Sequence, residues 1–512
     1  MSRPFPREKP TPMICVSIGR GRHRHMIAEH RFLAENGVQL VELRLDYIQG
    51  AVQVKRLLRE RPCPAIVTCR RQADGGRWQG TEEERLLVLR TAIAEGADWV
   101  DLEDDIAERV PRFGKTRRIV SHHDFQRTPA DLASVHARLA GMDADVVKIA
   151  TMADHPGDNL RMLDLVRSSR LPTVGLCMGE MGVPSRVLAC RSGAPFTFAT
   201  FHQDRVMAPG QIAWKPMRDV YRVEAITEKT AIYGVVADPV AHSLSPAVHN
   251  AALADAGIDA VYLPFRVPAE DLNDFLSEAG RWPLAGLSVT IPHKQAVLER
   301  TTACDELVEG IGAANTLRWL PDGGLEARNT DATAAVESLQ AAIAAQASDL
   351  GGPRAGTKSA LVLGAGGAAR AVAFGLKHSS MEVTVTSRTS ERAKEIADDV
   401  GCRSVDWDGR YRKPYDCIVN ATPVGMHPNV NETPFDKSSL RPYMIVFDTV
   451  YNPENTLLLK EARSVGCRTV TGVEMFVRQA MLQFEYWHGK PASAEVIRDA
   501  IKSATASHKP VG

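Results

Sequence analysis

The chain has 512 residues, of which 44% are hydrophobic and 24% charged, a composition typical of a globular protein with two to four domains. Lys plus Arg and Asp plus Glu number 62 each, so charge does not favour nucleic acid or a membrane surface as a partner. The nine cysteines form no Cys-X-X-Cys pair. We therefore expect no disulfide framework, no metal and a reducing, cytoplasmic location.

Short apolar runs alternate with helix-like segments from residue 12 onward. Eight strands are expected, at residues 13–18, 39–47, 64–70, 98–104, 118–124, 145–152, 172–179 and 195–202. Helices are expected between most of them, one beginning with a capping box from Thr81 to Glu84. This alternation predicts an α/β fold with a (β/α)8 TIM barrel over residues 12–223, whose chemistry lies at the C-terminal strand ends.

A lysine occupies the middle of one apolar strand, in Val-Val-Lys148-Ile-Ala. Burial disfavours the charged form of a lysine, and a neutral lysine is a nucleophile toward ketones. The alternative is a structural lysine in an ion pair. Polar residues late in the other strands favour catalysis, because they would converge on one barrel mouth; they are Glu42, Arg44, Arg70, Glu103 and His123.

Six motifs in the first half belong together. They are Glu-Leu-Arg-Leu-Asp (42–46), Thr-Cys-Arg (68–70), Ser-His-His-Asp-Phe (121–125), Val-Lys-Ile-Ala (147–150), Met-Gly-Val-Pro-Ser-Arg (181–186) and Ala-Pro-Gly-Gln (208–211). With these motifs, residues 13–221 resemble type I 3-dehydroquinate dehydratase.

The resemblance implies a role for each residue of the barrel mouth. Lys148 would form a Schiff base with the C3 ketone of 3-dehydroquinate, and His123 would remove the C2 proton. Glu103 would orient His123, and Arg186 would bind the substrate carboxylate. Glu42, Arg44, Arg70 and Gln211 would hold hydroxyls and close the pocket. His122 should face the other side of its strand. Met207 replaces the family's usual serine in the closing loop, which removes one hydrogen-bond donor to the substrate.

A charged linker is expected at residues 224–230, and a dinucleotide site follows in the second half. A strand leads into Gly364-Ala365-Gly366-Gly367-Ala368 and then a helix, the required context for a pyrophosphate-binding loop. The next strand ends in Ser387-Arg388-Thr389, with Arg392 one turn later. Arginine at this point favours the 2′-phosphate of NADP over NAD.

Further motifs surround this loop in the second half. Ser243 and Ser245 could bind a carboxylate or cap a helix. Other motifs contain Lys294, Asn315, Asp331, Asn420, Tyr451 and Gln479. Together they resemble shikimate dehydrogenase over residues 231–502. The resemblance implies that Ser243 and Ser245 bind the substrate carboxylate, while Thr290, Asn315 and Gln479 hold ring hydroxyls. Tyr451 would line the pocket and Lys294–Asp331 would be the catalytic pair. It adds Asn420, Thr422 and Gly472 to the cofactor site.

The expected second half has two lobes. Residues 231–339 plus 473–503 would bind substrate, residues 356–471 would be a Rossmann lobe for NADP, and residues 340–358 would be a flexible connection. The whole chain is thus expected to be a bifunctional enzyme in the fused domain order of plants. It would act on small molecules, without nucleic acid or membrane, as a monomer or homodimer. The alternatives are a quinate dehydrogenase in the second half, or one half retained only as a scaffold.

Overall fold

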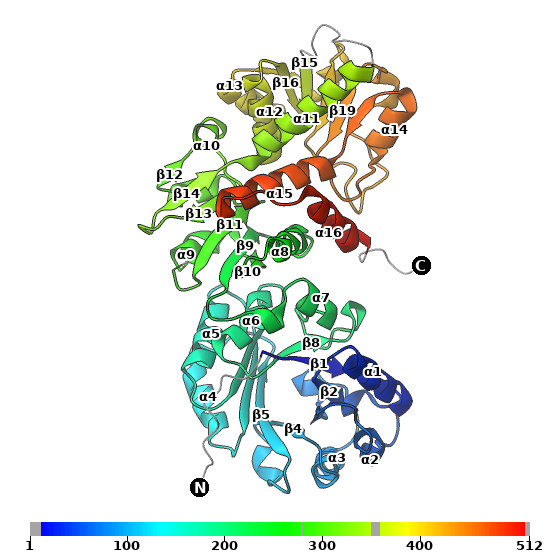
Figure 1. Ribbon diagram of the computed structural model, residues 1–512, viewed down its shortest axis with the longest axis vertical. Coiled ribbons are helices and arrows are strands. Elements are labelled where there is room, and N and C mark those ends of the chain that lie inside the picture. Colours follow the sequence, from blue (N-terminus) through cyan, green and yellow to red (C-terminus); the bar gives the residue numbers. More distant parts are fainter. Residues whose placement is uncertain (1–11, 279, 350–358, 507–512) are drawn as a thin grey trace. The chain divides into compact units, whose positions relative to one another are not determined.

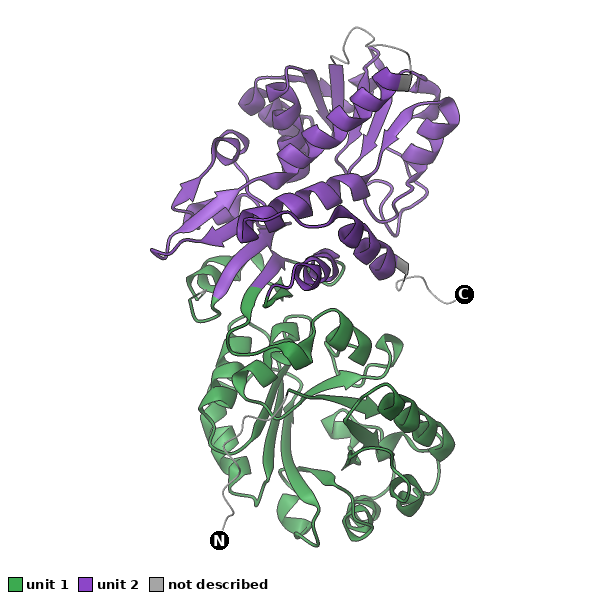
Figure 2. Ribbon diagram, viewed as in Figure 1, with its two compact units in different colours: residues 1–232, 238–242, 259–283 green, residues 233–237, 243–258, 284–512 purple. Residues whose placement is uncertain are grey.

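The computed structural model describes residues 12–278, 280–349 and 359–506. The chain forms two compact units (Figure 2). Unit 1 comprises residues 1–232, 238–242 and 259–283, and unit 2 comprises residues 233–237, 243–258 and 284–512. The domain boundaries expected from the sequence stay predictions, because these units divide the expected substrate lobe between them.

Eight parallel strands form a near-closed barrel in the first part of the chain (Figure 1). They are β1 (Ile14–Ile18), β2 (Leu40–Arg44), β3 (Ala65–Thr68), β4 (Trp99–Glu103), β5 (Arg117–Asp124), β6 (Val146–Met152), β7 (Thr173–Met178) and β8 (Thr197–Thr200). The hydrogen-bonded order runs from β7 through β1 to β8. Each strand lies at its expected place, and the barrel prediction is confirmed.

Helices separate the barrel strands and cover them. They are α1 (His23–Glu35), α2 (Val54–Leu58), α3 (Glu82–Ala94), α4 (Leu132–Ala140), α5 (Asp158–Ser168), α6 (Val183–Leu188) and α7 (Trp214–Asp219). The capping box before α3 is present: the Thr81 hydroxyl accepts from the Glu84 N–H, and the Glu84 carboxylate accepts from the Thr81 N–H. Register places Glu103 beside Ser121 and Ser121 beside Lys148, so the polar strand ends are neighbours across three strands.

A mixed sheet begins the second part of the chain, with strand order β10-β9-β11-β13-β14-β12. Its strands are β9 (Ala231–Ala237), β10 (Ala260–Arg266), β11 (Leu284–Val289), β12 (Ala303–Cys304), β13 (Thr316–Trp319) and β14 (Leu325–Arg328). Its helices are α8 (Ser245–Asp255), α9 (Leu272–Ser277) and α10 (Glu306–Ile311). β13 pairs antiparallel with both β11 and β14.

A parallel six-stranded sheet follows, in the order β17-β16-β15-β18-β19-β20. The strands are β15 (Ser359–Leu363), β16 (Glu382–Ser387), β17 (Arg403–Asp406), β18 (Cys417–Asn420), β19 (Ile445–Asp448) and β20 (Arg468–Val470). Numbered from β15, this is the 3-2-1-4-5-6 order of the Rossmann fold, with α12 (Gly367–His378), α13 (Ser390–Val400) and α14 (Leu457–Val465) between strands. Its topological switch point lies between β15 and β18, where such folds bind dinucleotides.

Three further helices complete this part: α11 (Thr330–Asp349), α15 (Gly472–His488) and α16 (Ala494–Ala506). The expected flexible connection is wrong for residues 340–349, which continue α11 because their alanine-rich sequence favours helix. Residues 350–358 lie outside the described residues. Among the helices that the structure describes, none combines the length and apolarity of a membrane span.

Candidate active sites

The expected barrel-mouth residues gather around one cavity at the C-terminal strand ends. Of the eight site residues expected in this half, seven line it: Glu42, Arg44, Arg70, His123, Lys148, Arg186 and Gln211. Phe125, Phe198 and Met207 also contribute to the wall. Glu103 is the exception, because it does not line the cavity. The cavity therefore combines charged groups and aromatic rings, as a small polar ligand needs.

Lys148 is 6% exposed and its ammonium has close neighbours. Its Nζ donates to Oδ2 of Asp101 at 2.9 Å. The same nitrogen lies 4.0 Å from a Glu42 oxygen and 4.2 Å from the centre of the Phe198 ring. The lysine is therefore both buried and paired, and its reactive nitrogen borders the cavity. Sequence reasoning missed Asp101, although it lies two residues before Glu103, on the same face of β4.

His123 is a half-buried histidine whose ring has no hydrogen bond to a carboxylate among the described residues. Its Nδ1 has no hydrogen-bond partner among the described residues, and its ring stacks on Phe125 with centroids 6.3 Å apart. Burial, followed by the charges of Arg70 and Lys148, lowers its pKa well below the ordinary value of 6.5. The ring is thus neutral at pH 7 and can accept a proton. His122 points elsewhere as expected: its Nδ1 lies 3.0 Å from an Asp104 oxygen.

Glu103 differs from the expectation that it orients His123. Its two oxygens accept from Arg70 at 2.9 Å and from Arg85 of α3 at 2.8 Å. Arg85 is fully buried and also bonds to Glu82 and to the Cys69 carbonyl. A carboxylate surrounded by two guanidinium groups gains more from them than from a neutral imidazole. In this structure Glu103 therefore positions Arg70.

Arg186 is a buried cation with no acid partner among the described residues. It is 2% exposed, its Nη2 donates to the Pro209 carbonyl at 3.0 Å, and its Nε has no partner among these residues. Burial lowers the pKa of the guanidinium to about 10, which leaves it charged at neutral pH. A buried, uncompensated guanidinium is a ready site for a carboxylate.

The loop 207–211 covers part of the cavity. Oε1 of Gln211 accepts from the backbone N–H of Met207 at 2.8 Å and of Ala208 at 3.2 Å. Gly210 has φ +72°, and a Cβ there would lie 2.1 Å from the Gly179 carbonyl oxygen, so only glycine fits. The Met207 sulfur lies 3.7 Å from Arg44, whose guanidinium bonds to both oxygens of Asp46. Gln211 thus shapes the loop; its contact with substrate stays a prediction.

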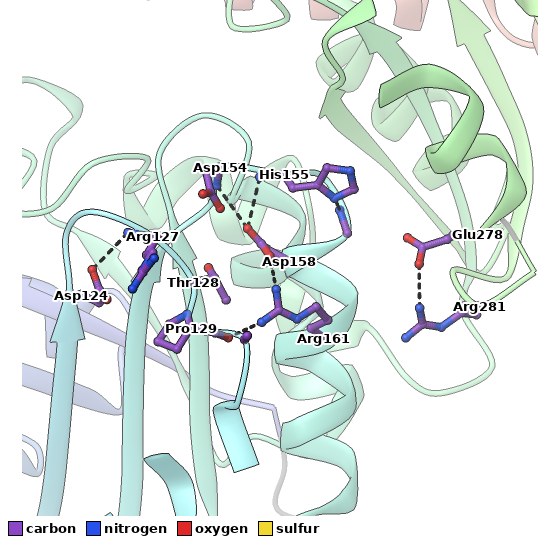
Figure 3. Close-up of a pocket in the computed structure, with 12 residues that line it drawn as sticks. Asp124, Arg127, Thr128, Pro129, Asp154, His155, Asp158, Arg161, Glu278 and Arg281 are labelled. Atoms are coloured by element: carbon purple, nitrogen blue, oxygen red, sulfur yellow. Dashed lines mark hydrogen bonds and ion pairs between the residues drawn. The ribbon is translucent and has the colours of Figure 1, made fainter. Parts of the chain in front are cut away.

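A second cavity of about 670 Å³ lies beside the ends of β5 and β6 (Figure 3). Most of the charged side chains that line this cavity form ion pairs or hydrogen bonds with one another or with the nearby backbone. Asp158 accepts from the backbone N–H groups of Asp154 and His155 and pairs with Arg161 at 2.8 Å. Glu278 and Arg281 pair with each other at 2.8 Å. It contains no residue expected in either active site.

Lys294 and Asp331 form the expected pair in the second half. Nζ of Lys294 lies 2.5 Å from Oδ2 of Asp331, and both side chains are partly exposed, at 17% and 11%. Lys294 follows β11, and Asp331 lies in the first turn of α11. A Cβ on Gly367 of the dinucleotide loop would lie 3.4 Å from the Lys294 side chain. The pair therefore adjoins the expected nicotinamide site.

The other expected substrate residues lie in the same half. The Ser245 N–H donates to the Ser243 hydroxyl at 3.3 Å at the start of α8. Asn315 bonds to Thr330 at 2.9 Å, and Tyr451 stacks on Phe476. Thr290 is half-buried after β11, and Gln479 is buried on α15. Their contacts with substrate stay predictions.

Gln483 is a residue that sequence reasoning missed. Its amide nitrogen donates to the Asn315 carbonyl and the Thr316 hydroxyl at 3.0 Å each, and its oxygen accepts from Ser288 at 2.8 Å. It thereby connects α15 to β11 and to the segment that carries Asn315. The one feature of the sequence that could have pointed to Gln483 is its position one helical turn after Gln479.

The dinucleotide loop lies at the switch point of the Rossmann sheet. Gly364 has φ +127°, and a Cβ there would lie 2.6 Å from the Ala421 carbonyl oxygen, so glycine is required where the β15 and β18 loops meet. Ala365, Gly366, Gly367 and Ala368 continue into α12. Asn420 ends β18 and accepts from the Thr422 hydroxyl at 2.6 Å. Gly472 opens α15.

The end of β16 carries free positive charge. Arg388, Thr389 and Arg392 are exposed there, and Ser387 is half-buried. Neither arginine has an ion-pair partner among the described residues. These residues fit an NADP molecule, because the loop gives its pyrophosphate a close approach and the arginines can bind its 2′-phosphate. No group of three or more potential metal ligands occurs in the described part of the chain.

Comparison with known proteins divides the chain into the same two halves. Residues 14–228 match the family model of type I 3-dehydroquinase. Residues 235–317 match the shikimate dehydrogenase substrate binding domain, and residues 472–502 match the shikimate 5′-dehydrogenase C-terminal domain. The fold is that of a type I dehydroquinase barrel joined to a shikimate dehydrogenase.

The full chain is 38% identical over 503 residues to the bifunctional 3-dehydroquinate dehydratase/shikimate dehydrogenase, chloroplastic, of Arabidopsis thaliana, covering 94% of this chain and 83% of the plant protein. The second half is 41% identical over 289 residues to the shikimate dehydrogenase (NADP(+)) of Methanopyrus kandleri, 54% of this chain and 97% of that protein. A crystal structure of a shikimate dehydrogenase in complex with NADP+ matches with TM-score 0.50 at 35% identity, over 54% of this chain and 96% of that chain. The chain belongs to the bifunctional 3-dehydroquinate dehydratase/shikimate dehydrogenase family.

Proposed function

We propose that this chain catalyses two consecutive steps of the shikimate pathway, which leads to aromatic amino acids. The barrel dehydrates 3-dehydroquinate to 3-dehydroshikimate, and the second half reduces that product to shikimate with NADPH. The observation that carries the proposal is the cavity in which a buried lysine, a half-buried neutral histidine and a buried arginine without an acid partner among the described residues meet. A ketone-bearing carboxylic acid satisfies all three groups at once.

In the barrel, Arg186 binds the substrate carboxylate and thereby directs the ketone toward Lys148. Nζ of Lys148 attacks the C3 carbonyl, and loss of water gives the iminium. The iminium withdraws electrons, so the C2 proton becomes acidic and His123 removes it. The electron pair then expels the C1 hydroxyl, to which His123 returns the proton. Hydrolysis of the iminium releases 3-dehydroshikimate and regenerates the lysine.

In the second half, Ser243 and Ser245 bind the carboxylate, and Thr290, Asn315 and Gln479 orient the ring with Tyr451 against it. Bound NADPH supplies the hydride that reduces the C3 ketone. Lys294 lies where it can donate a proton to the new alkoxide, and Asp331 at 2.5 Å holds it in place. Arg388 and Arg392 select NADP by binding its 2′-phosphate.

Borohydride trapping tests the barrel reaction. Incubation of the full chain with 3-dehydroquinate and borohydride should attach the reduced substrate to the peptide that contains Lys148, and mass spectrometry locates the added mass. An unmodified Lys148 peptide would exclude the Schiff-base mechanism and would leave the barrel as a scaffold.

The second reaction is tested by comparing initial rates. Shikimate with NADP should be oxidised faster than quinate with NAD, because Arg388 and Arg392 are free to bind a 2′-phosphate. A faster rate with quinate and NAD would identify the second half as a quinate dehydrogenase. During coupled turnover, free 3-dehydroshikimate in stopped samples would show that the intermediate leaves the first site before reaching the second.

A reducing cytoplasm is also part of the proposal. All nine cysteines are free thiols, and five of them are buried in or beside strands of the barrel or the Rossmann sheet: Cys15, Cys69, Cys177, Cys417 and Cys467. Cell fractionation followed by thiol labelling of the native chain checks this location. We propose a monomer or homodimer, which light scattering distinguishes by mass.

A further inference from the structure

Asp101 is a buried carboxylate that touches the reactive nitrogen of the barrel. Its side chain is 0% exposed, and Oδ2 accepts from Nζ of Lys148 at 2.9 Å. The other oxygen, Oδ1, accepts from the Ser121 hydroxyl at 2.6 Å and lies 2.9 Å from Nη2 of Arg70. Groups on β5, on β6 and just after β3 thus fix both oxygens, and Oδ2 is the oxygen that contacts Lys148.

This carboxylate is ionised in the folded protein. Burial alone would raise the pKa of Asp101, but the charges of Arg70 and Lys148 outweigh burial and hold the pKa well below its ordinary value of 3.8. Asp101 is therefore a poor proton acceptor at neutral pH. It acts as a fixed negative charge and not as the base of the reaction.

The charge on Nζ explains why a fixed carboxylate is useful there. In the condensation, the lysine ammonium with its three protons reacts with the ketone and becomes an iminium whose nitrogen keeps one proton. The ketone oxygen becomes a water molecule. Two protons leave with the oxygen, and the nitrogen is positive before and after the condensation. A carboxylate 2.9 Å away therefore faces a cation in both states, and the single N–H of the iminium can donate to it.

We propose that Asp101 is the counter-ion of the Schiff-base nitrogen, a catalytic residue that keeps the iminium protonated. This inference rests on the proposed dehydratase function. A protonated iminium withdraws electrons far better than a neutral imine, so loss of the counter-ion removes the group that acidifies the C2 proton.

The other charged groups that face Lys148 or Asp101 are engaged elsewhere. Glu42 lies 4.0 Å from Nζ, but its oxygens accept from Ser17 and Thr68. Arg44 is bound by Asp46, Glu103 is bound by Arg70 and Arg85, and His123 is neutral because burial and the nearby cations lower its pKa. Asp101 is the carboxylate in hydrogen-bond contact with the nitrogen.

The test measures how the trapped adduct depends on pH. The full-length chain and Asp101→Asn are mixed with 3-dehydroquinate and cyanoborohydride, which reduces iminium, between pH 5 and 9, and the mass at Lys148 is quantified. Wild type should give adduct through neutral pH. In Asp101→Asn we expect at least about a tenfold smaller yield at pH 7, recovering toward pH 5, because each unit of pH restores about tenfold more of the protonated imine.

Two further variants separate charge from structure. Asp158→Asn removes another buried carboxylate of the barrel, outside the Lys148 cavity, and should follow the wild-type pH curve. Ser121→Ala keeps Asp101 but removes the 2.6 Å hydrogen bond to Oδ1, and should move the midpoint of the curve part of the way toward acid. Ser121→Ala also provides the test if Asp101→Asn does not fold, as judged by circular dichroism.

The outcomes distinguish the two levels of the proposal. Absence of adduct in wild type overturns the dehydratase function itself. If wild type forms the adduct and Asp101→Asn has the same pH midpoint as wild type, only the role of Asp101 is overturned. Where Asp101→Asn is unfolded, an unchanged midpoint in Ser121→Ala leads to the same conclusion. An equal loss at every pH, without recovery in acid, assigns Asp101 a purely structural role and likewise overturns it.

Discussion

The two halves of this enzyme place their lysines in different surroundings. Lys148 lies on a barrel strand, next to Asp101 and within a network that extends through Arg70 and Glu103 to Arg85 on an outer helix. Lys294 follows a strand end and has one carboxylate partner, Asp331, with both side chains partly exposed. The first lysine has several buried charges around it, whereas the second has a single ion pair.

The reactions explain this difference. The Schiff-base nitrogen is positive before and after the condensation, so the surrounding charges must be fixed in a dry site before the substrate arrives. In a hydride transfer the cofactor supplies the reducing equivalent, and the protein only has to orient the substrate and deliver one proton. The comparison predicts that substitutions in the barrel affect chemistry, and that several in the second half affect binding.

The largest effect should come from Lys148→Ala. Because Lys148 is the single lysine among the described residues that line the cavity, dehydration should fall by about 10⁴-fold or more. Shikimate oxidation by the same preparation should keep its wild-type rate, which controls for folding of the second half. Dehydration above about one per cent of wild type would contradict the covalent mechanism.

Asp331→Asn should produce the next largest effect, in the other half. The substitution removes the carboxylate 2.5 Å from Lys294 and disturbs the orientation and charge of the proton donor. The kcat of reduction should fall by about 10²- to 10³-fold, the range of general acid–base contributions. Dehydration serves as the internal control. Equal loss of both activities would mean that the halves are not independent.

Arg186→Met should weaken substrate binding in the barrel and spare the fold. The carboxylate would lose its buried partner, so kcat/KM of dehydration should fall by roughly a hundredfold. The thermal midpoint should stay the same or rise, because an uncompensated buried cation is removed. Arg191→Met is the control, since the Nε of Arg191 also has no hydrogen-bond partner among the described residues but this side chain lies outside the cavity. A large loss of stability in Arg186→Met would refute this account.

Arg388→Ala should have a smaller effect, limited to the cofactor. The KM for NADPH should rise by about tenfold, because one charge-assisted contact to the 2′-phosphate is lost. The rate with NADH, which lacks that phosphate, should not change, and this provides the control. An equal effect on both cofactors would place Arg388 outside the phosphate site.

The smallest effect is the response of dehydration to pH near neutrality. Burial, Arg70 and Lys148 lower the pKa of His123 well below 6.5, so the base stays neutral as pH falls from 8 to 6.5. The acid limb of kcat/KM should therefore appear only well below pH 6.5, where the imidazole finally becomes protonated. A pH–rate profile between pH 5 and 9 measures it, and an inflection at 6.5 or above would contradict a lowered pKa of His123.

Much of the fold could be predicted from local patterns. The eight strands of the barrel, the capping box at Thr81 and the strand–loop–helix context of Gly364 are short-range features, because strand period, helix capping and tight turns depend on neighbouring residues. The expected flexible connection was wrong at residues 340–349, where the apparent break in pattern proved to be the continuation of α11.

The sequence by itself determined most of the side chains that gather at these places: Lys148, His123 and Arg186 line one barrel cavity, and Lys294 and Asp331 form one pair. The tertiary structure decided which partners these side chains take. Glu103 binds Arg70 and Arg85 and not His123, Asp101 binds Lys148, and Gln483 binds the segment that contains Asn315. The physical reason is that a buried polar atom bonds to the donor or acceptor that packing brings within about 3 Å, and those partners come from segments far apart in the chain.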